Sequence, residues 1–261
     1  MGMPGNHHLA IPGPAEDTST IPRSAQMKIT YHGHSAFRIE TGDAVILVDP
    51  FFTGNPAATV GWQEASTGLT HLLLTHGHGD HVGDSLEILK TTGATLVSNF
   101  EVCSWLNGKG AEKYSPGNHG GRISFDDFDV IFTNAWHSSS DMVAGQPVYL
   151  GNPAGFVIEP KKEHGNTLYI AGDTGLSYDM KLIQELYRPE IGILPIGDRF
   201  TMGGDQAAYA CRHFFDFKTV IPCHFASFKG YVDDDASKFL KAMGPDAAKV
   251  RVMTSCETMT F

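Results

Sequence analysis

Residues 75–81 read THGHGDH, and this short stretch brings three histidines and one aspartate together in the sequence. Imidazole and carboxylate groups together suit zinc and its first-row neighbours better than magnesium or calcium, which prefer oxygen ligands alone. With 13 histidines in 261 residues, such a cluster would rarely arise by chance. The stretch therefore predicts a transition-metal site.

The segments that precede this cluster are apolar and predict buried strands. HLLLTH at 71–76 carries the start of the cluster at its C-terminal end, and AVILVDP at 44–50 is a second run of the same kind. Continuous apolar runs of this length are typical of strands that are covered on both faces. MKITYHG at 27–33 and SAFRIET at 35–41 predict two more strands, so the first part of the chain is expected to form a sheet.

Strands and helices alternate in the rest of the chain. Helices are predicted at 82–93, 101–106, 177–186 and 203–215, followed by one with an acidic start at 233–235. GFVIEP and NTLYIAGD, joined by KKEHG at 161–165, predict a hairpin. The polar run SSSDMVAGQ at 138–146 predicts a loop, whereas AKVRVMT at 248–254 and ETMTF at 257–261 predict two closing strands.

Three further candidate ligands stand in the same setting as the cluster. His137, Asp173 and His224 each follow an apolar strand. Because functional side chains of α/β proteins gather beyond the carboxyl ends of strands, residues far apart in the sequence can meet at one edge of a sheet. We therefore expect these three side chains to lie near the cluster.

Composition and charge restrict the classes of function. The 261 residues, 41% of them hydrophobic, can fill the core of one large domain, and no run of about 18 apolar residues predicts a membrane span. A formal net charge of -10 argues against a broad phosphate-binding surface for nucleic acid. The four cysteines form no CxxC pair, which is typical of reduced thiols in a cytoplasmic protein.

The N-terminal residues 1–26 differ in composition from the rest of the chain. They lack the apolar core of a secretory signal and are rich in proline, glycine and small polar residues. Such a segment cannot bury enough apolar surface to fold alone, so it is predicted to be a flexible or arm-like extension. The folded domain is predicted to span residues 27–261.

Several motifs resemble the metallo-β-lactamase superfamily and, within it, the group called UPF0173 metal-dependent hydrolases, relatives of the ascorbate-6-phosphate lactonases. They are YHGHS at 31–35, THGHGDHVGD at 75–84, AWHSSS at 135–140, PAGF at 153–156, AGDTGLSYDMKLI at 171–183 and LPIGDRFTMG at 194–203. The resemblance covers nearly all of residues 27–261. It implies an α+β fold, a four-layer αββα sandwich of two mixed sheets flanked by helices, with a dinuclear metal site between the sheet edges.

The resemblance also implies which residues would bind each ion. His76, His78 and His137 would hold the first metal, and Asp80, His81 and His224 the second, with Asp173 bridging both. Two divalent ions are expected, zinc in first place, with manganese, iron or nickel as alternatives. Asp49 would hold the metal loop by hydrogen bonds rather than bind an ion.

The implied activity is that of a metal-dependent hydrolase that uses a metal-bridging hydroxide on a small-molecule ester, lactone or phosphoester. Asp80 could also orient the nucleophile or carry a proton to the leaving group. His34, in the motif GHS, is a candidate substrate contact or proton donor, and a structural turn histidine is an equal alternative.

Candidate substrate contacts lie in two loops that resemble pocket-lining loops of the family. Ser138 follows a predicted ligand, and Asp198 and Thr201 lie in GDRFTMG, where turn capping is an equal alternative for both. The run FASF at 225–228 departs from the tyrosine and asparagine expected in relatives. The specificity of relatives therefore need not transfer to this chain.

Two other classes of function share this fold. A di-iron redox protein commonly has a glutamate where this chain has His78, so the imidazole disfavours that class. A non-catalytic metal-binding protein is disfavoured because all seven implied ligands are present. A nucleic-acid phosphodiesterase lacks support, since no basic stripe occurs. A homo-oligomer is compatible with the sequence.

Overall fold

The computed structural model describes residues 26–161 and 165–261. The expected N-terminal extension therefore lies outside the described residues except for Gln26, as does the middle of the expected turn at 161–165. GFVIEP and NTLYIAGD, on the two sides of that turn, pair as antiparallel strands, as predicted. No helix in the described part of the chain is long and apolar enough to cross a lipid bilayer.

The strands form two sheets and a separate hairpin. The first sheet has the order β15-β1-β2-β3-β4-β5-β6, and its strands are β1 (Lys28–Gly33), β2 (Ala36–Thr41), β3 (Ala44–Val48), β4 (His71–Leu73), β5 (Thr95–Asn99), β6 (Tyr114–Gly117) and β15 (Thr258–Thr260). The second sheet has the order β14-β13-β12-β11-β8-β7, and its strands are β7 (Arg122–Ser124), β8 (Phe128–Asn134), β11 (Ala154–Pro160), β12 (Leu168–Ile170), β13 (Ile191–Pro195) and β14 (Thr219–Cys223). Both sheets contain parallel and antiparallel pairs.

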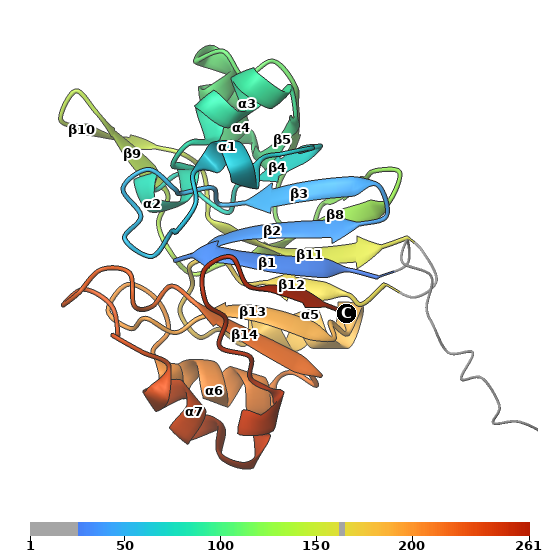
Figure 1. Cartoon of the computed structure of the whole chain (residues 1–261), viewed down its shortest axis with the longest axis vertical. Helices are drawn as coiled ribbons and strands as arrows, with labels where there is room; N and C mark the ends of the chain where they lie inside the picture. The colour runs from blue at the N-terminus through green and yellow to red at the C-terminus, as the bar shows by residue number, and fades with distance from the viewer. Residues whose placement is uncertain (1–25, 162–164) are drawn as a thin grey trace, which may run out of the picture.

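Helices cover the outer face of each sheet (Figure 1). Those packed on the first sheet are α1 (Trp62–Ala65), α3 (Ser85–Thr92) and α4 (Phe100–Gly108). Those packed on the second sheet are α5 (Asp179–Tyr187), α6 (Gly204–His213) and α7 (Ser237–Met243), and a 3-10 helix at Gly244–Lys249 follows the last of them. The short helix α2 (Gly79–Val82) lies at one edge of the sandwich.

Three apolar clusters hold these layers together. One lies between the sheets, where Ile46 and Val48 of the first sheet share a cluster with Phe156 of the second. Leu47, between those two residues on β3, belongs instead to the cluster under the helices. Side chains on a strand alternate between its faces, so a strand that is buried on both sides is apolar throughout, as 44–48 is. The αββα prediction is confirmed.

Two local predictions are wrong. Residues 138–146 are not entirely a loop, because they contain the first strand of a hairpin. The hairpin consists of β9 (Ser140–Val143) and β10 (Gln146–Tyr149), and its turn has positive φ at Ala144 and Gly145. The hairpin is exposed, so its residues lack the alternation of a half-buried strand. Residues 248–254 are not a strand, and they make one isolated bridge, Val220 to Val250, before Met253 enters the core between the sheets.

The directions of the strands bring the loops that carry six candidate site residues to one edge. β3 and β4 run parallel, as do β12, β13 and β14. β1 has the same direction as β3 because both are antiparallel to β2. β8 has the same direction as β12 because both are antiparallel to β11. The loops that follow these strands carry the residues His34, Asp49, His76, His137, Asp173 and His224. The carboxyl ends of strands from both sheets thus meet at the edge near α2 (Figure 1).

Candidate metal centre

Three imidazoles form the first cluster at this edge. His76 and His78 follow β4 on extended backbone, and His137 follows β8. The Nδ1 atom of His78 lies 3.0 Å from Nε2 of His76 and 3.3 Å from Nε2 of His137. Three nitrogen atoms that converge in this way could hold one transition-metal ion such as zinc.

A second cluster lies beside the first. It contains His34, Asp80, His81 and His224, whose ligand atoms lie within 4.8 Å of one another. Asp80 and His81 belong to α2, which turns the chain after His78, and the ring of His81 lies 4.1 Å from that of His76, measured between centroids, so His81 borders both clusters. This change of direction between extended backbone and helix was expected from the spacing of the motif.

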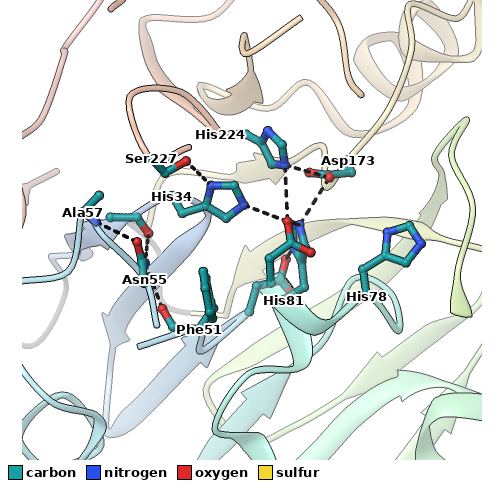
Figure 2. Close-up of polar contacts among 12 residues, drawn as sticks. His34, Phe51, Asn55, Ala57, His78, His81, Asp173, His224 and Ser227 are labelled. Carbon is teal, nitrogen blue, oxygen red and sulfur yellow. Dashed lines mark hydrogen bonds and ion pairs between the residues drawn. The ribbon is translucent and has the colours of Figure 1, made fainter. Parts of the chain in front are cut away.

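Asp173 lies between the two clusters. Its Oδ2 atom is 3.0 Å from Nε2 of His224 and 3.2 Å from Nε2 of His81 (Figure 2). Nε2 of His137 lies 3.7 Å from the same oxygen. The structure therefore brings all seven predicted ligands together, and Asp173 occupies the position of a bridging carboxylate. Their assignment to two ions remains a prediction.

Two buried atoms test whether this group of residues fits a metal. Both are fully buried: Oδ1 of Asp173 has no hydrogen-bond partner among the described residues, and Nε2 of His81 lies 3.2 Å from Oδ2 of Asp173 but outside hydrogen-bond geometry. An unpaired buried polar atom is costly, and metal coordination is one way to satisfy it. The donors are imidazole nitrogens and carboxylate oxygens, which is the ligand chemistry of zinc and its neighbours. The residues fit such ions.

Asp49 holds the segment 75–81 in place through three hydrogen bonds. Its Oδ1 accepts from the Thr75 backbone N–H at 2.8 Å, and its Oδ2 accepts from the Thr75 hydroxyl at 2.7 Å and from Nδ1 of His81 at 2.8 Å. Since the Thr75 hydroxyl donates to Asp49, it can accept from Nδ1 of His76, 2.9 Å away. Both imidazoles then carry their proton on Nδ1 and turn a bare Nε2 towards the site.

Burial keeps most of the imidazoles neutral, which metal binding requires. It lowers the pKa of His76 well below the usual value, and it also lowers those of His78 and His137. For His81, burial acts in the same direction, but the carboxylates of Asp173 and Asp49 outweigh it and raise the pKa. A divalent ion would replace that proton as the positive partner of Asp173.

His34 is held differently from the predicted ligands. It has no exposed surface, and burial lowers its pKa to about 4, so the ring is neutral at pH 7. Its Nε2 lies 3.1 Å from Oδ2 of Asp80 and its Nδ1 lies 2.7 Å from the Ser227 hydroxyl (Figure 2). A carboxylate only accepts hydrogen bonds, so Nε2 donates to Asp80 and Nδ1 accepts from Ser227.

Asp80 is thereby kept as an anion at the mouth of the site. Burial alone would raise its pKa, but the hydrogen bond from His34 and the charge of His81 hold the pKa well below the usual range. Asp80 lines the cavity beside the metal ligands, whereas His34 lies behind it. His34 thus reaches the cavity only through Asp80, and its direct contact with substrate remains a prediction.

A cavity of about 400 Å³ opens onto both clusters. It is lined by His78, Asp80, His137, Ser138, Asp173, Phe200 and His224. The Ser138 hydroxyl lies 3.4 Å from Nε2 of His78, at the ring nitrogen that faces away from the other two imidazoles. Ser138 is thus placed both to contact a substrate and to orient His78.

The other two candidate substrate contacts do not line this cavity. Asp198 borders a separate hollow with Arg199, and its Oδ1 accepts from the Arg199 backbone N–H at 2.8 Å. Thr201 is half-buried and donates to the Met202 carbonyl at 3.2 Å. Both residues therefore have the turn-forming contacts that were predicted as the alternative to a substrate-binding role. Their contact with substrate remains a prediction.

Sequence reasoning did not single out Phe200 or Ser227. Phe200 lines the cavity from within the motif GDRFTMG, and Ser227 lies in FASF, the run that was expected from the sequence to differ from relatives. That expected difference was the available signal for Ser227. Nothing in the local pattern distinguishes Phe200 from an ordinary exposed loop aromatic.

Comparison with known proteins agrees with this geometry. The family model described as the beta-lactamase superfamily domain matches residues 28–224, a range that contains every residue of both clusters. The chain belongs to this superfamily. A UPF0173 metal-dependent hydrolase of Methylocella silvestris is 54% identical over 224 residues, which are 86% of this chain and 95% of the relative. One of Mesorhizobium japonicum is 52% identical over 238 residues, covering 90% and 100%.

A solved structure supports the same placement. The metallo hydrolase Igni18 from Ignicoccus hospitalis aligns with a TM-score of 0.80 and 36% identity, over 90% of this chain and 98% of that one. Within the superfamily, the chain therefore belongs to the UPF0173 group, and the resemblance inferred from its motifs is confirmed.

Proposed function

We propose that this protein is a metal-dependent hydrolase of a small-molecule ester, lactone or phosphoester. The observation that carries the proposal is the convergence of seven ligand side chains, in two clusters around Asp173, on the floor of a cavity of about 400 Å³. Relatives more than 50% identical are named metal-dependent hydrolases. A cavity of this size suits a small molecule.

Two divalent ions, zinc in first place, fit the two clusters. His76, His78 and His137 would hold one ion, Asp80, His81 and His224 the other, and Asp173 would contact both. When bound, such ions act as Lewis acids on a carbonyl or phosphoryl oxygen and lower the pKa of water from 15.7 to about 7. The all-imidazole cluster at His78 favours zinc over the oxygen-rich sites of di-iron redox proteins.

The residues around the cavity have separate tasks in the hydrolysis. The oxygen of water forms a bond to the acyl carbon or phosphorus, the bond to the leaving alcohol breaks, and a water proton ends on that alcohol. Asp80, held as an anion by His34 and Ser227, accepts a hydrogen bond from the attacking water and orients it. Ser138 fixes the ring of His78 and lies where the substrate enters.

The test is reconstitution of metal-free protein, ion by ion, with zinc, manganese, iron and nickel. Each preparation is assayed against an ester, a lactone and a phosphodiester, and bound metal is measured by mass spectrometry. We expect up to two ions per chain and hydrolysis that appears only in loaded protein. His78→Ala should lose one ion and at least about 100-fold in kcat with an unchanged circular dichroism spectrum.

His71→Ala is a matched control, because His71 lies outside both clusters and its Nδ1 contacts the Thr70 hydroxyl. It should keep both ions and its activity. Full metal content and full activity in His78→Ala would contradict the ligand assignment, and a loaded wild type that cleaves none of the three bonds would contradict the proposed function.

A further inference from the structure

A second cavity, of about 280 Å³, adjoins the one above the metal ligands. It is lined by Asp80, Phe200, His224, Phe228, Tyr231 and Val232. Asp80, Phe200 and His224 line both cavities, so the two meet at these side chains. Away from Asp80 and His224, the wall of the second cavity consists of three aromatic rings and one valine. A molecule whose reacting bond lies beside Asp173 would therefore extend across apolar surface.

The ring of Phe228, in the aromatic wall, is held by contacts on its buried side. The ring of Phe228 packs against the imidazole of His34 at 5.3 Å and stacks on the ring of Phe51 at 6.1 Å, as measured between centroids. The backbone N–H groups of Tyr231 and Val232 both donate to the Phe228 carbonyl, at 2.9 and 3.1 Å. The segment that carries Phe228 and Tyr231 is thus a closed turn, and the cavity exists before any ligand binds.

The outer rim is held by one cation. The guanidinium carbon of Arg199 lies 5.0 Å from the ring centroid of Tyr231 and 5.5 Å from that of Phe200. The Asp233 backbone N–H also donates to the Gly197 carbonyl at 2.9 Å and joins the two loops. Tyr231 and Phe200 are about half exposed, so these contacts keep two large apolar side chains in place at the surface.

The charges around the second cavity disfavour an anionic group there. No lysine or arginine occurs among the described residues that line either cavity, and the carboxylates of Asp80 and Asp173 are predicted ligands of the two ions. Arg199 borders the outer hollow, where it is accompanied by Asp198, Asp233 and Asp234. A phosphate or carboxylate on the distal part of a substrate would have no cationic partner in the apolar cavity and would lose its hydration.

We propose that the substrates are uncharged carboxylic esters or lactones that carry an alkyl or aryl substituent, and that this substituent occupies the cavity of Phe200, Phe228, Tyr231 and Val232. This inference rests on the proposed hydrolase function and narrows its substrate class. Of the three substrate classes considered above, it selects carboxylic esters and lactones over phosphoesters, and it excludes phosphorylated lactones as preferred substrates.

The first experiment measures kcat/KM of the zinc-reconstituted protein for ethyl esters from acetate to octanoate. Each methylene that is buried in the cavity should raise kcat/KM by about fourfold until the cavity is full. Monoethyl adipate, which adds a carboxylate at the far end, should be at least about tenfold poorer than ethyl hexanoate. In Tyr231→Ala and Phe200→Ala, the ratio of hexanoate to acetate should fall by about tenfold.

Tyr114→Ala is the matched control, because Tyr114 is a comparably exposed aromatic residue on β6 that lines neither cavity. It should keep the wild-type chain-length dependence. Hydrolysis with a flat dependence on chain length, a preference for monoethyl adipate, or unchanged ratios in Tyr231→Ala and Phe200→Ala would overturn the inference.

A second readout needs no catalysis. A neutral, polarity-sensitive naphthalene fluorophore is titrated into metal-free wild type, Tyr231→Ala, Phe200→Ala and Tyr114→Ala. We expect binding by wild type and Tyr114→Ala that weakens at least about fivefold in the other two variants. Equal binding by all four proteins, or by none, overturns the apolar site. Normal probe binding with no hydrolysis of any ester would instead show that the proposed function, rather than the cavity, is wrong.

Discussion

His34 illustrates how single hydrogen bonds shape this site. Nε2 of His81 faces Asp173 at 3.2 Å outside hydrogen-bond geometry, whereas both nitrogens of His34 are engaged in hydrogen bonds. The ring of His34 also lies 4.1 Å from that of His224, measured between centroids. A nitrogen that already donates to a carboxylate has no free lone pair for an ion, so we expect His34 to position Asp80 rather than bind metal.

Replacing His34 with asparagine tests this role. Asparagine tolerates the left-handed backbone of residue 34, where φ is 57°, but its shorter amide cannot join Ser227 to Asp80. We expect kcat to fall about 10- to 100-fold while both ions are retained, as measured by steady-state kinetics and by metal analysis. Ser227→Ala should lower kcat in the same direction by less. Unchanged kinetics in both variants would leave His34 a purely structural turn residue.

At the scale of one element, helix α2 decides where Asp80 and His81 point. It is only four residues long and ends at Gly83, which has φ 41° and ψ -120°. A Cβ atom at Gly83 would lie 2.5 Å from Cα of Phe51 and 2.6 Å from the Pro50 carbonyl oxygen. The close contact between α2 and the loop after β3 therefore depends on the absence of a side chain at residue 83.

Gly83→Ala should displace α2 and with it two predicted ligands. We expect a loss of about 2 to 4 kcal/mol in the free energy of unfolding, together with weaker retention of one ion. Gly79→Ala in the same helix is the control, because nothing lies within 4 Å of a Cβ at that position. Urea denaturation and metal titration of both variants measure the two effects. Equal stability of the two variants would show that the contact at Gly83 is unimportant.

Across the whole molecule, buried neutral histidines tie stability to pH. His32 is 5% exposed, has no hydrogen-bond partner for Nε2 among the described residues and packs on Phe52 at 5.4 Å. Burial, helped by the charge of Arg38, lowers its pKa from 6.5 to about 4. The unfolded chain therefore takes up a proton at a higher pH than the folded chain does. The stabilisation is complete above pH 6.5 and is lost as the pH falls towards 4.

His32→Leu should remove this part of the pH dependence. Between pH 7 and pH 5, the metal-free wild type should lose about 2 kcal/mol of unfolding free energy through His32, since each pKa unit is worth about 1.36 kcal/mol. The variant should lose less over the same range by about that amount. Urea denaturation of metal-free protein at both pH values measures the difference. Parallel losses in the two proteins would contradict a neutral, buried His32.

The sequence by itself was enough to name the seven candidate ligands that converge in the structure and to predict the layer order. HxHxDH places its residues by backbone geometry alone, since an extended segment followed by a helix directs His78 and Asp80 to different sides. His137, Asp173 and His224 could be added because each follows an apolar strand, and the resemblance to the superfamily supplied the αββα order. These features depend on residues that are close together in the chain, or on motifs that match the superfamily over their whole length.

Only the tertiary structure decided what surrounds the metal ligands. Phe200 lies in the loop after β13 and Phe228 and Tyr231 lie in the loop after β14, so their common cavity depends on how β13 and β14 pair and on the contacts of Arg199. The contact between His34 and Ser227 spans 193 positions, and the segment 248–254 is kept from the sheet by its passage to the core. Distances between such loops follow from packing and strand register, which no local pattern encodes.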